Sequence, residues 1–217
     1  MPLRILLEAA DIQPGVVDIL LHAADRYTDT LPLEKAIDPS TLVAYEMNGE
    51  PLPKRHGYPA RVIVPGLFGK NHVKWVRRIE LINTHVKGFY EQQGWGPSFV
   101  IPITSRFDQP AHEQVVSRSA DAVVLLKGVA FAGARGVSRV EVSFDDGQSW
   151  QDARIDYRGA PLAWIFWSYP WTARQSGTYK LVVRATDATG MLQTATEHNS
   201  DPEGATGYHR ITVRVEA

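Results

Sequence analysis

The sequence predicts an α+β protein in two parts. Short helices and strands are expected over residues 1–112, and an immunoglobulin-like β-sandwich over residues 113–217. Three observations predict this: apolar residues in the first part follow both helix and strand spacing, residues 94–112 are rich in Pro and Gly without periodicity, and short apolar runs separated by turn residues follow. A chain of 217 residues is long enough for two small domains that each bury a core.

The first part is expected to begin with a short helix, because Leu3, Leu6, Leu7 and Ala10 recur at the spacing of one buried helix face. The elements expected after it are a strand at 16–21, a loop at 25–30, a helix at 31–37, and strands at 41–47, 61–64 and 73–82. Asn48-Gly49 favours a tight turn after one of these strands. The segment 73–82 also fits a helix, and its Val, Trp and Ile content favours the strand.

Six short runs predict the strands of the second part. They cover residues 122–130, 137–144, 150–155, 163–171, 178–185 and 208–215. No Cys-Trp-Cys pattern is present, so an antibody-type domain is excluded. The segment 143–150 fits S-x-D-x-G-x-x-W, which we interpret as a structural hairpin turn without catalysis. Trp167, Tyr169 and Trp171 share one strand face, which favours a core or subunit interface over a sugar-binding platform.

Composition excludes several classes of function. With 23 basic and 24 acidic residues, the chain has no overall basic surface for nucleic acid. Because it contains no cysteine, disulfides, thiolate nucleophiles, cysteine zinc sites and iron–sulfur clusters are absent. No hydrolase motif such as G-x-S-x-G or H-E-x-x-H occurs. No apolar run spans a membrane and Met1–Arg4 does not begin a signal peptide, so a periplasmic or membrane-associated address would depend on a longer parent protein.

The charge is distributed unevenly along the first part. Residues 1–47 carry eight acidic and three basic side chains, a net charge of −5, whereas residues 48–88 carry eight basic and two acidic ones, a net charge of +6. The basic segment combines Gly and Pro with His56, Arg61, His72 and Lys74, and this combination indicates an anion site. A solvated basic hairpin is an equally good interpretation of the same composition.

Metal binding is not assigned from the sequence. His198, Asn199 and His209 could share a metal ion only if the fold brought them together.

Four short segments in order carry a resemblance to a known family: AYEMNGEPLP at 44–53, HGYPAR at 56–61, VPG at 64–66 and HVKW at 72–75. Together they resemble the sulfite oxidase family of molybdopterin-dependent oxidoreductases. The second part resembles that family's dimerisation domain in GVAFAG at 128–133, VSRVEVS at 137–143 and ATD at 185–187. The resemblance implies part of a sulfite-oxidase-type mixed α/β molybdopterin domain, followed by the immunoglobulin-like dimerisation domain.

The resemblance implies molybdopterin as the cofactor, with molybdenum held by its dithiolene and by one protein cysteine. The cofactor contacts implied for this chain are Asp25, His56, Arg61, His72, Val73 and Lys74. Tyr27 is the candidate for the family's substrate-side catalytic tyrosine. The metal ligand is not expected here, because the family's cysteine lies N-terminal to the matched residues; the chain therefore resembles the C-terminal portion of an enzyme.

The implied activity is oxygen-atom or two-electron transfer on a small-molecule substrate, with electrons passed to a haem protein or domain. A homodimer through the second part is also implied. Near Asp201-Pro202-Glu203 the animal enzymes carry a substrate-side arginine, where this sequence is acidic. Two alternatives stay open: a non-catalytic β-sandwich binding module that presents the aromatic run at 164–171, and a degraded relative that keeps only the dimer role.

Overall fold

The computed structural model describes residues 1–118, 123–160 and 162–216, and the chain divides into two compact units. The first unit is Met1–Val100 and the second begins at Ile101. The sequence predicts this boundary near residue 113. The difference arises because part of the expected linker forms strand β8 (Thr104–Gln109), which pairs with β10 (Val123–Phe131) in the second unit.

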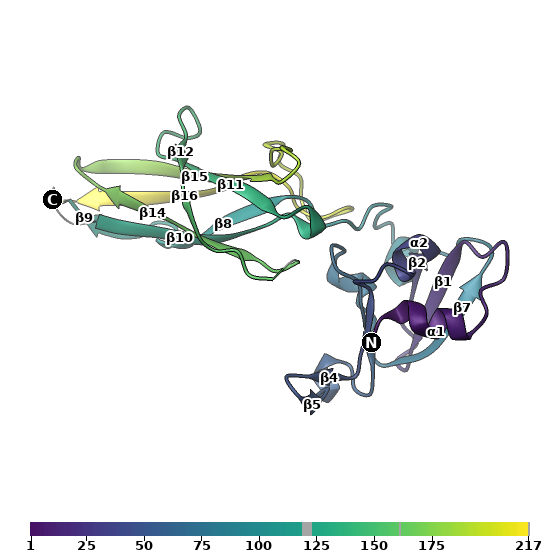
Figure 1. Ribbon diagram of the computed structural model, residues 1–217. Helices are drawn as coiled ribbons and strands as arrows, with labels where there is room; N and C mark the ends of the chain where they lie inside the picture. Colours follow the sequence, from purple (N-terminus) through teal and green to yellow (C-terminus); the bar gives the residue numbers. More distant parts are fainter. Residues whose placement is uncertain (119–122, 161, 217) are drawn as a thin grey trace. The chain divides into compact units, whose positions relative to one another are not determined.

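The first unit combines small antiparallel sheets with short helices (Figure 1). Its elements are α1 (Leu3–Ala9), β1 (Asp18–Ala23), β2 (Thr28–Pro32), α2 (Leu33–Ala36), β3 (Leu42–Ala44), β4 (Glu46–Met47), β5 (Glu50–Pro51), η1 (Lys54–His56), β6 (Arg61–Ile63), η2 (Gly69–Asn71), β7 (Val76–Ile82) and α3 (Phe89–Gln92). The sheets have the orders β2-β1-β7, β3-β6 and β4-β5. No helix among the described residues has the length and hydropathy that crossing a membrane requires.

Helix α1 packs on the core of the first unit through one narrow stripe of apolar side chains. Leu3 and Leu7 are buried in a cluster with Ile19 and Val62. Leu6 was expected on the same face but is exposed, because a helix of seven residues covers the small sheet with only two of its apolar side chains. The expected strand at 73–82 is confirmed from Val76 onward as β7.

The loop expected at 25–30 is the main error in the first unit. Only its first residues form a turn, and Thr28 begins strand β2, which pairs with β1 from Asp18↔Pro32 to His22↔Thr28. The polar sequence concealed a strand because Asp29 and Thr30 are both buried and hydrogen-bonded. The predicted turn at Asn48-Gly49 is confirmed, since both residues have positive φ between β4 and β5.

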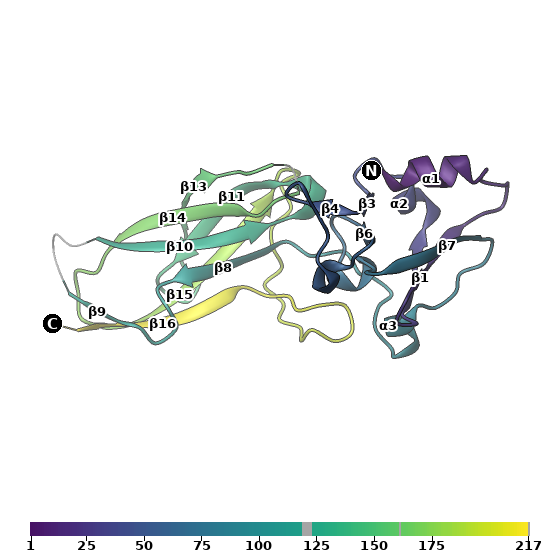
Figure 2. The same cartoon turned by 90° about the horizontal axis from the view of Figure 1, so that it is seen from below.

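The second unit consists of two sheets packed face to face (Figures 1 and 2). Its elements are β8 (Thr104–Gln109), β9 (Val115–Ser117), β10 (Val123–Phe131), η3 (Gly133–Arg135), β11 (Val137–Ser143), β12 (Gln151–Asp152), β13 (Arg154–Tyr157), β14 (Ile165–Thr172), β15 (Gly177–Asp187) and β16 (His209–Glu216). One sheet has the order β13-β14-β10-β8 and the other β12-β11-β15-β16-β9. All six predicted runs contain strands, and the start of the first, Ala122, lies outside the described residues.

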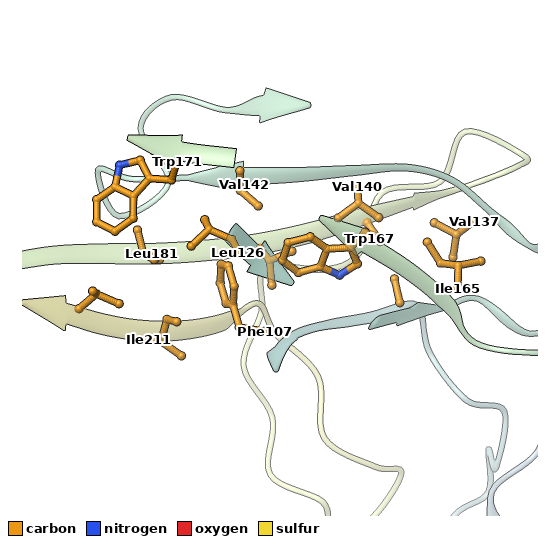
Figure 3. Packing of buried hydrophobic residues seen from close by; sticks show 14 of the residues in the cluster. Phe107, Leu126, Val137, Val140, Val142, Ile165, Trp167, Trp171, Leu181 and Ile211 are labelled. Atoms are coloured by element: carbon orange, nitrogen blue, oxygen red, sulfur yellow. The ribbon is translucent and has the colours of Figure 1, made fainter. Parts of the chain in front are cut away.

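Both tryptophans of β14 belong to the core. Trp167 is 1 % exposed and packs edge-to-face on Phe107, with ring centroids 5.4 Å apart, and Trp171 lies in the same cluster (Figure 3). The core interpretation is therefore confirmed. For the alternative of a binding module that presents the run at 164–171, Trp167 offers a ligand no surface, whereas Trp164 and Phe166 are 45 and 50 % exposed.

The segment 143–150 is the predicted hairpin turn. The Asp145 carboxylate accepts hydrogen bonds from Gln148 N and Ser149 N at 3.1 and 2.9 Å, and Gly147 has a φ of 91°. Trp150 packs edge-to-face on Tyr208. The motif thus closes a turn with its own side chains, as turn chemistry requires.

Two carboxylates of the second unit make its stability depend on pH in the acid range. Hydrogen bonds from Ser149 and Ser143 lower the pKa of Asp145 to about 2, and those from Thr189, Met191 and Arg135 lower the pKa of Asp187 to about 2. Because these pKa values lie below the ordinary 3.8, the stabilisation is complete above about pH 4 and is lost as pH falls toward 2. We expect the urea midpoint of unfolding to fall across this range, and to fall less in Asp187→Asn. An unchanged slope in that variant would contradict the assignment.

Candidate functional site

Arg61 joins the two halves of the basic segment. Its Nη1 donates to the carbonyl oxygen of His56 at 3.2 Å and its Nη2 to that of His72 at 3.2 Å. Arg61 begins β6, and the neighbouring Val62 N donates to Val73 O at 2.9 Å. One guanidinium therefore fixes the end of η1 against the loop that follows η2, because its planar fork binds two carbonyls at once.

Close backbone approach tightens this junction. A Cβ at Gly57 would lie 3.1 Å from Lys74 Cβ and 3.0 Å from Arg61 Cβ, and the φ of Gly57 is 114°. Lys74 Nζ donates to Arg55 O and Trp75 Nε1 to Lys54 O, each at 2.8 Å. Glycine is required here by its backbone conformation and by the lack of space for a side chain.

A pocket of about 280 Å³ opens beside this junction. Its lining residues come from the β1–β2 turn, from η2 and the loop after it, and from α3: Ala23, Asp25, Tyr27, Gly69, Lys70, His72, Val73, Lys74, Trp75 and Tyr90. Five of the seven predicted site residues thus line one pocket. His56 and Arg61 are not in the lining, and they are linked to it through the hydrogen bonds of Arg61.

His72 is held as a neutral ring. Its Nε2 lies 2.9 Å from Val64 O, an acceptor, so this nitrogen carries the proton. Burial lowers the pKa of His72, and the nearby Arg61 charge lowers it further. Lysine and arginine therefore supply the permanent positive charge of the junction, and His72 contributes position and hydrogen bonding.

Tyr27 and Asp25 form the wall of the pocket that the β1–β2 turn supplies. Asp25 Oδ1 accepts from Tyr27 N at 3.1 Å, and Tyr27 OH donates to Lys70 O at 2.9 Å. The Tyr27 ring packs on Phe89 and Tyr90, with centroids 5.7 and 6.2 Å away. Burial and the carboxylate of Asp29 raise the pKa of Tyr27, so the phenol stays protonated at neutral pH.

Lys70, which lines the pocket, belongs to a buried ion pair. Lys70 Nζ lies 3.0 Å from Asp29 Oδ1, and Asn71 Nδ2 donates to Asp29 Oδ2 at 3.0 Å. Burial raises the pKa of Asp29 to about 6, although Lys70 opposes this rise. The pair anchors η2 to β2, and η2 leads directly into His72–Lys74.

The site fits an anionic group with hydrogen-bond acceptors. Arg61 Nε is buried and has no protein partner in the described residues. Within the same residues, neither Arg61 nor Lys74 forms an ion pair with a carboxylate; both bind only backbone carbonyls. Two cations without counter-ions and an orphaned donor are the arrangement that a phosphate-bearing ligand satisfies.

Sequence reasoning missed part of the site. Asp29 gave no signal because its polar neighbours indicated a loop, and Tyr90 comes from helix α3, which was not predicted. Lys70 lay in the basic segment but was not singled out as a site residue. Periodicity cannot reveal such residues, since long-range packing places them.

Among the described residues, the His, Asp and Glu side chains are not grouped as a metal site requires. Across residues 1–118, 123–160 and 162–216, no group of three or more His, Asp or Glu side chains is placed to hold a metal ion. His198, Asn199 and His209 do line one polar pocket in the second unit, but Phe107 N donates to His209 Nδ1.

Comparison with family models matches both units. Residues 1–90 match the oxidoreductase molybdopterin binding domain, and residues 98–216 match the Mo-co oxidoreductase dimerisation domain.

Individual relatives agree with these matches. Mitochondrial sulfite oxidase of Rattus norvegicus is 37 % identical over 165 residues, covering 65 % of this chain and 30 % of its own length. The nitrate reductase [NADH] 2 of Phaseolus vulgaris is 30 % identical over 85 % of this chain and 24 % of its own length. The solved sulfane dehydrogenase SoxCD from Paracoccus pantotrophus superposes with a TM-score of 0.84 and 28 % identity, covering all of this chain and 61 % of that one. The chain thus spans less than a third of the length of these two curated relatives.

Removing one partner of the Lys70–Asp29 pair tests how much this pair contributes to stability. We expect Lys70→Met to lower the free energy of unfolding by about 3–5 kcal/mol, because it leaves the Asp29 carboxylate buried without its cation. The double variant Lys70→Met/Asp29→Asn should lose less than the sum of the two single variants. Urea unfolding measures both, and additive losses would show that the pair is not coupled.

Proposed function

The chain belongs to the sulfite oxidase family of molybdopterin-dependent oxidoreductases. We propose that it is the portion of such an enzyme that binds part of the cofactor and forms the dimer. In this proposal residues 1–112 are the C-terminal part of the molybdopterin-binding domain, with the compact unit ending at Val100. The remainder is the immunoglobulin-like dimerisation domain. The observation that carries the proposal is the Arg61 junction. It holds Arg61, which has no carboxylate partner among the described residues, next to a pocket that Lys74 lines.

Each proposed cofactor contact has a chemical reason. Lys74 and Arg61 offer charge to the cofactor's phosphate, and Arg61 Nε offers a buried donor. His56 belongs to the loop that Arg61 holds, and Val73 contributes its backbone between His72 and Lys74. Asp25, which also lines the pocket, has carboxylate oxygens that can accept from ring N–H groups of the pterin.

The cofactor, when bound, supplies two-electron or oxygen-atom chemistry at molybdenum. The chain's own residues bind and orient it. The neutral His72 ring keeps its loop in place through Val64. Tyr27 is proposed as the substrate-side residue; since its proton is donated to Lys70 O, its oxygen is free to accept a hydrogen bond at the pocket wall.

Substrate and acceptor are proposed only by class. The substrate is a small molecule, and the electrons go to a haem protein or haem domain, as the family resemblance implies. The matched dimerisation model supports a homodimer through the second unit.

Loss of the cationic contacts should release the cofactor. We expect Arg61→Ala and Lys74→Ala, each in the longer protein that supplies the cysteine, to weaken pterin binding about 10- to 100-fold, since a hydrogen bond to a charged group contributes about 1.5–3 kcal/mol. The measurement is pterin and molybdenum per protein after gel filtration. Arg77→Ala is the matched control, because Arg77 is exposed on β7 in the same basic segment and outside the pocket. Equal losses in all three variants would contradict the proposal.

The 217-residue chain by itself should not retain molybdenum. It contains no cysteine, so the thiolate ligand of the family must come from another segment. Metal analysis of the purified chain, alone and as part of the longer protein, is expected to find molybdenum only in the latter. Stoichiometric molybdenum on the isolated chain would contradict this.

A further inference from the structure

The segment between β7 and α3 carries a histidine that lies between two carboxylates. His85 Nδ1 is 2.7 Å from Asp18 Oδ2, and His85 Nε2 is 3.3 Å from Glu91 Oε1. Asp18 begins β1 and Glu91 belongs to α3. The two carboxylate side chains are only 10 and 14 % exposed, whereas the ring is 57 % exposed. His85 therefore joins α3 to the central strand of the sheet β2-β1-β7.

Both contacts are hydrogen bonds at the same time only when the imidazole is protonated. An ionised carboxylate can only accept, so each ring nitrogen must carry a proton to bind its partner. A neutral ring has one N–H group and one lone pair, so it keeps one bond and turns the lone pair toward the other carboxylate. Among the described residues, Asp18 and Glu91 are the acidic groups within ion-pair distance of the ring. The arrangement thus fits the imidazolium.

Glu91 connects this ring to the wall of the pocket. Its Oε2 accepts from Gly88 N at 2.9 Å, a bond that closes the first turn of α3. The residue before it, Tyr90, lines the pocket. The rings of Phe89 and Tyr90 pack on Tyr27, with centroids 5.7 and 6.2 Å away. The position of Glu91 therefore affects the helix that presents these aromatic side chains.

Helix α3 has few other attachments among the described residues. Residues 83–88, which lead into it, form neither helix nor strand. Phe89 and Tyr90 stay 46 and 36 % exposed, so each gains only part of the stabilisation of a buried aromatic ring. Thr30 Oγ1 donates to Val86 O and adds one further contact with β2. A single side-chain bridge can therefore change how often this short helix opens.

We propose that His85 is a positioning residue, which in its protonated form holds α3 against β1 and keeps Tyr90 at the pocket wall. We call the set Asp18, His85 and Glu91 the His85 clamp. Loss of the ring proton removes one of its two bonds, so α3 opens more often and the wall becomes less ordered. The inference rests on the proposed function only for what the pocket holds.

The direction of the pH dependence follows from the partners of the ring. The hydrogen bond to Asp18 raises the pKa of His85, and the charge of Glu91 raises it further. Because this pKa lies above the ordinary 6.5, the clamp is complete below about pH 6.5 and is lost as pH rises through the raised value. Asp29 faces the same segment, since a Cβ at Gly88 would lie 2.5 Å from its Oδ1, and its pKa is about 6.

Amide hydrogen exchange of the 217-residue chain measures the clamp. The reporters are the N–H groups that close α3 and the turn after it, those of Gln92, Gln93 and Gly94. We expect their protection factors, corrected for the intrinsic exchange rate at each pH, to fall about 2- to 5-fold from about pH 5.5 to about pH 8, the effect of losing one part-exposed ionic bond.

His85→Gln isolates the histidine from Asp29, because glutamine donates hydrogen bonds without titrating in this range. Its profile should be flatter than that of the wild type by the same factor of about 2 to 5. His22→Gln is the matched control, since His22 is also a part-buried histidine of the first unit but pairs with Glu80 at 3.1 Å on β7. The His22→Gln profile should follow the wild type.

A double-variant cycle tests whether Asp18 acts on α3 through His85. We expect Asp18→Asn to lower the protection factors of α3 at about pH 5.5, and to lower them less when position 85 is already glutamine. A role of Asp18 in the stability of β1 alone would give the same loss in both backgrounds. Such additive losses would overturn the clamp.

The outcomes separate this inference from the proposed function. Identical profiles in the wild type and His85→Gln, or protection factors near one at every pH, would overturn the clamp whatever the Arg61 and Lys74 variants do. Unchanged pterin retention in those two variants would instead overturn the cofactor role and leave the clamp as a pH-dependent element of the fold. The exchange experiment needs no cofactor, so neither result depends on the other.

Discussion

The guanidinium of Arg61 is the interaction on which the candidate site depends. It binds the carbonyl oxygens of His56 and His72, and these residues belong to segments that have no regular strand pairing with each other. Lys74 Nζ and Trp75 Nε1 add hydrogen bonds to Arg55 O and Lys54 O across the same junction. The bridge leaves Nε unsatisfied in a buried position, a cost that structures rarely carry without a ligand.

The two units differ in how their buried and half-buried cationic side chains are paired. In the second unit, cations such as Arg184 and Arg135 are matched to buried carboxylates, so charge serves folding. In the first unit, Asp29 neutralises Lys70, but Arg61 and Lys74 keep their charge for use beside the pocket. This division agrees with a cofactor-binding unit joined to a scaffold that dimerises.

Sequence reasoning predicted the architecture better than the fine structure of the site. Strand periodicity located the sandwich strands, because alternate residues such as Leu181 and Val183 face a continuous core. It missed β8 and β2, since Pro-rich and Asp-rich sequences indicate loops unless tertiary contacts satisfy them. The predicted cofactor residues came from the family resemblance, and four of the six line one pocket. The neutral state of His72 and the support from Asp29 depend on burial, which a sequence pattern does not encode.

The central claim is that the basic segment grips the anionic end of a pterin cofactor. The most direct measurement is a crystal structure of the longer protein with its cofactor bound, read for the atoms within hydrogen-bond distance of the cofactor's phosphate. The account predicts Lys74 Nζ and the Arg61 guanidinium among them, with the pterin ring toward Asp25. A phosphate bound elsewhere, with Arg61 Nε still unpartnered, would contradict it.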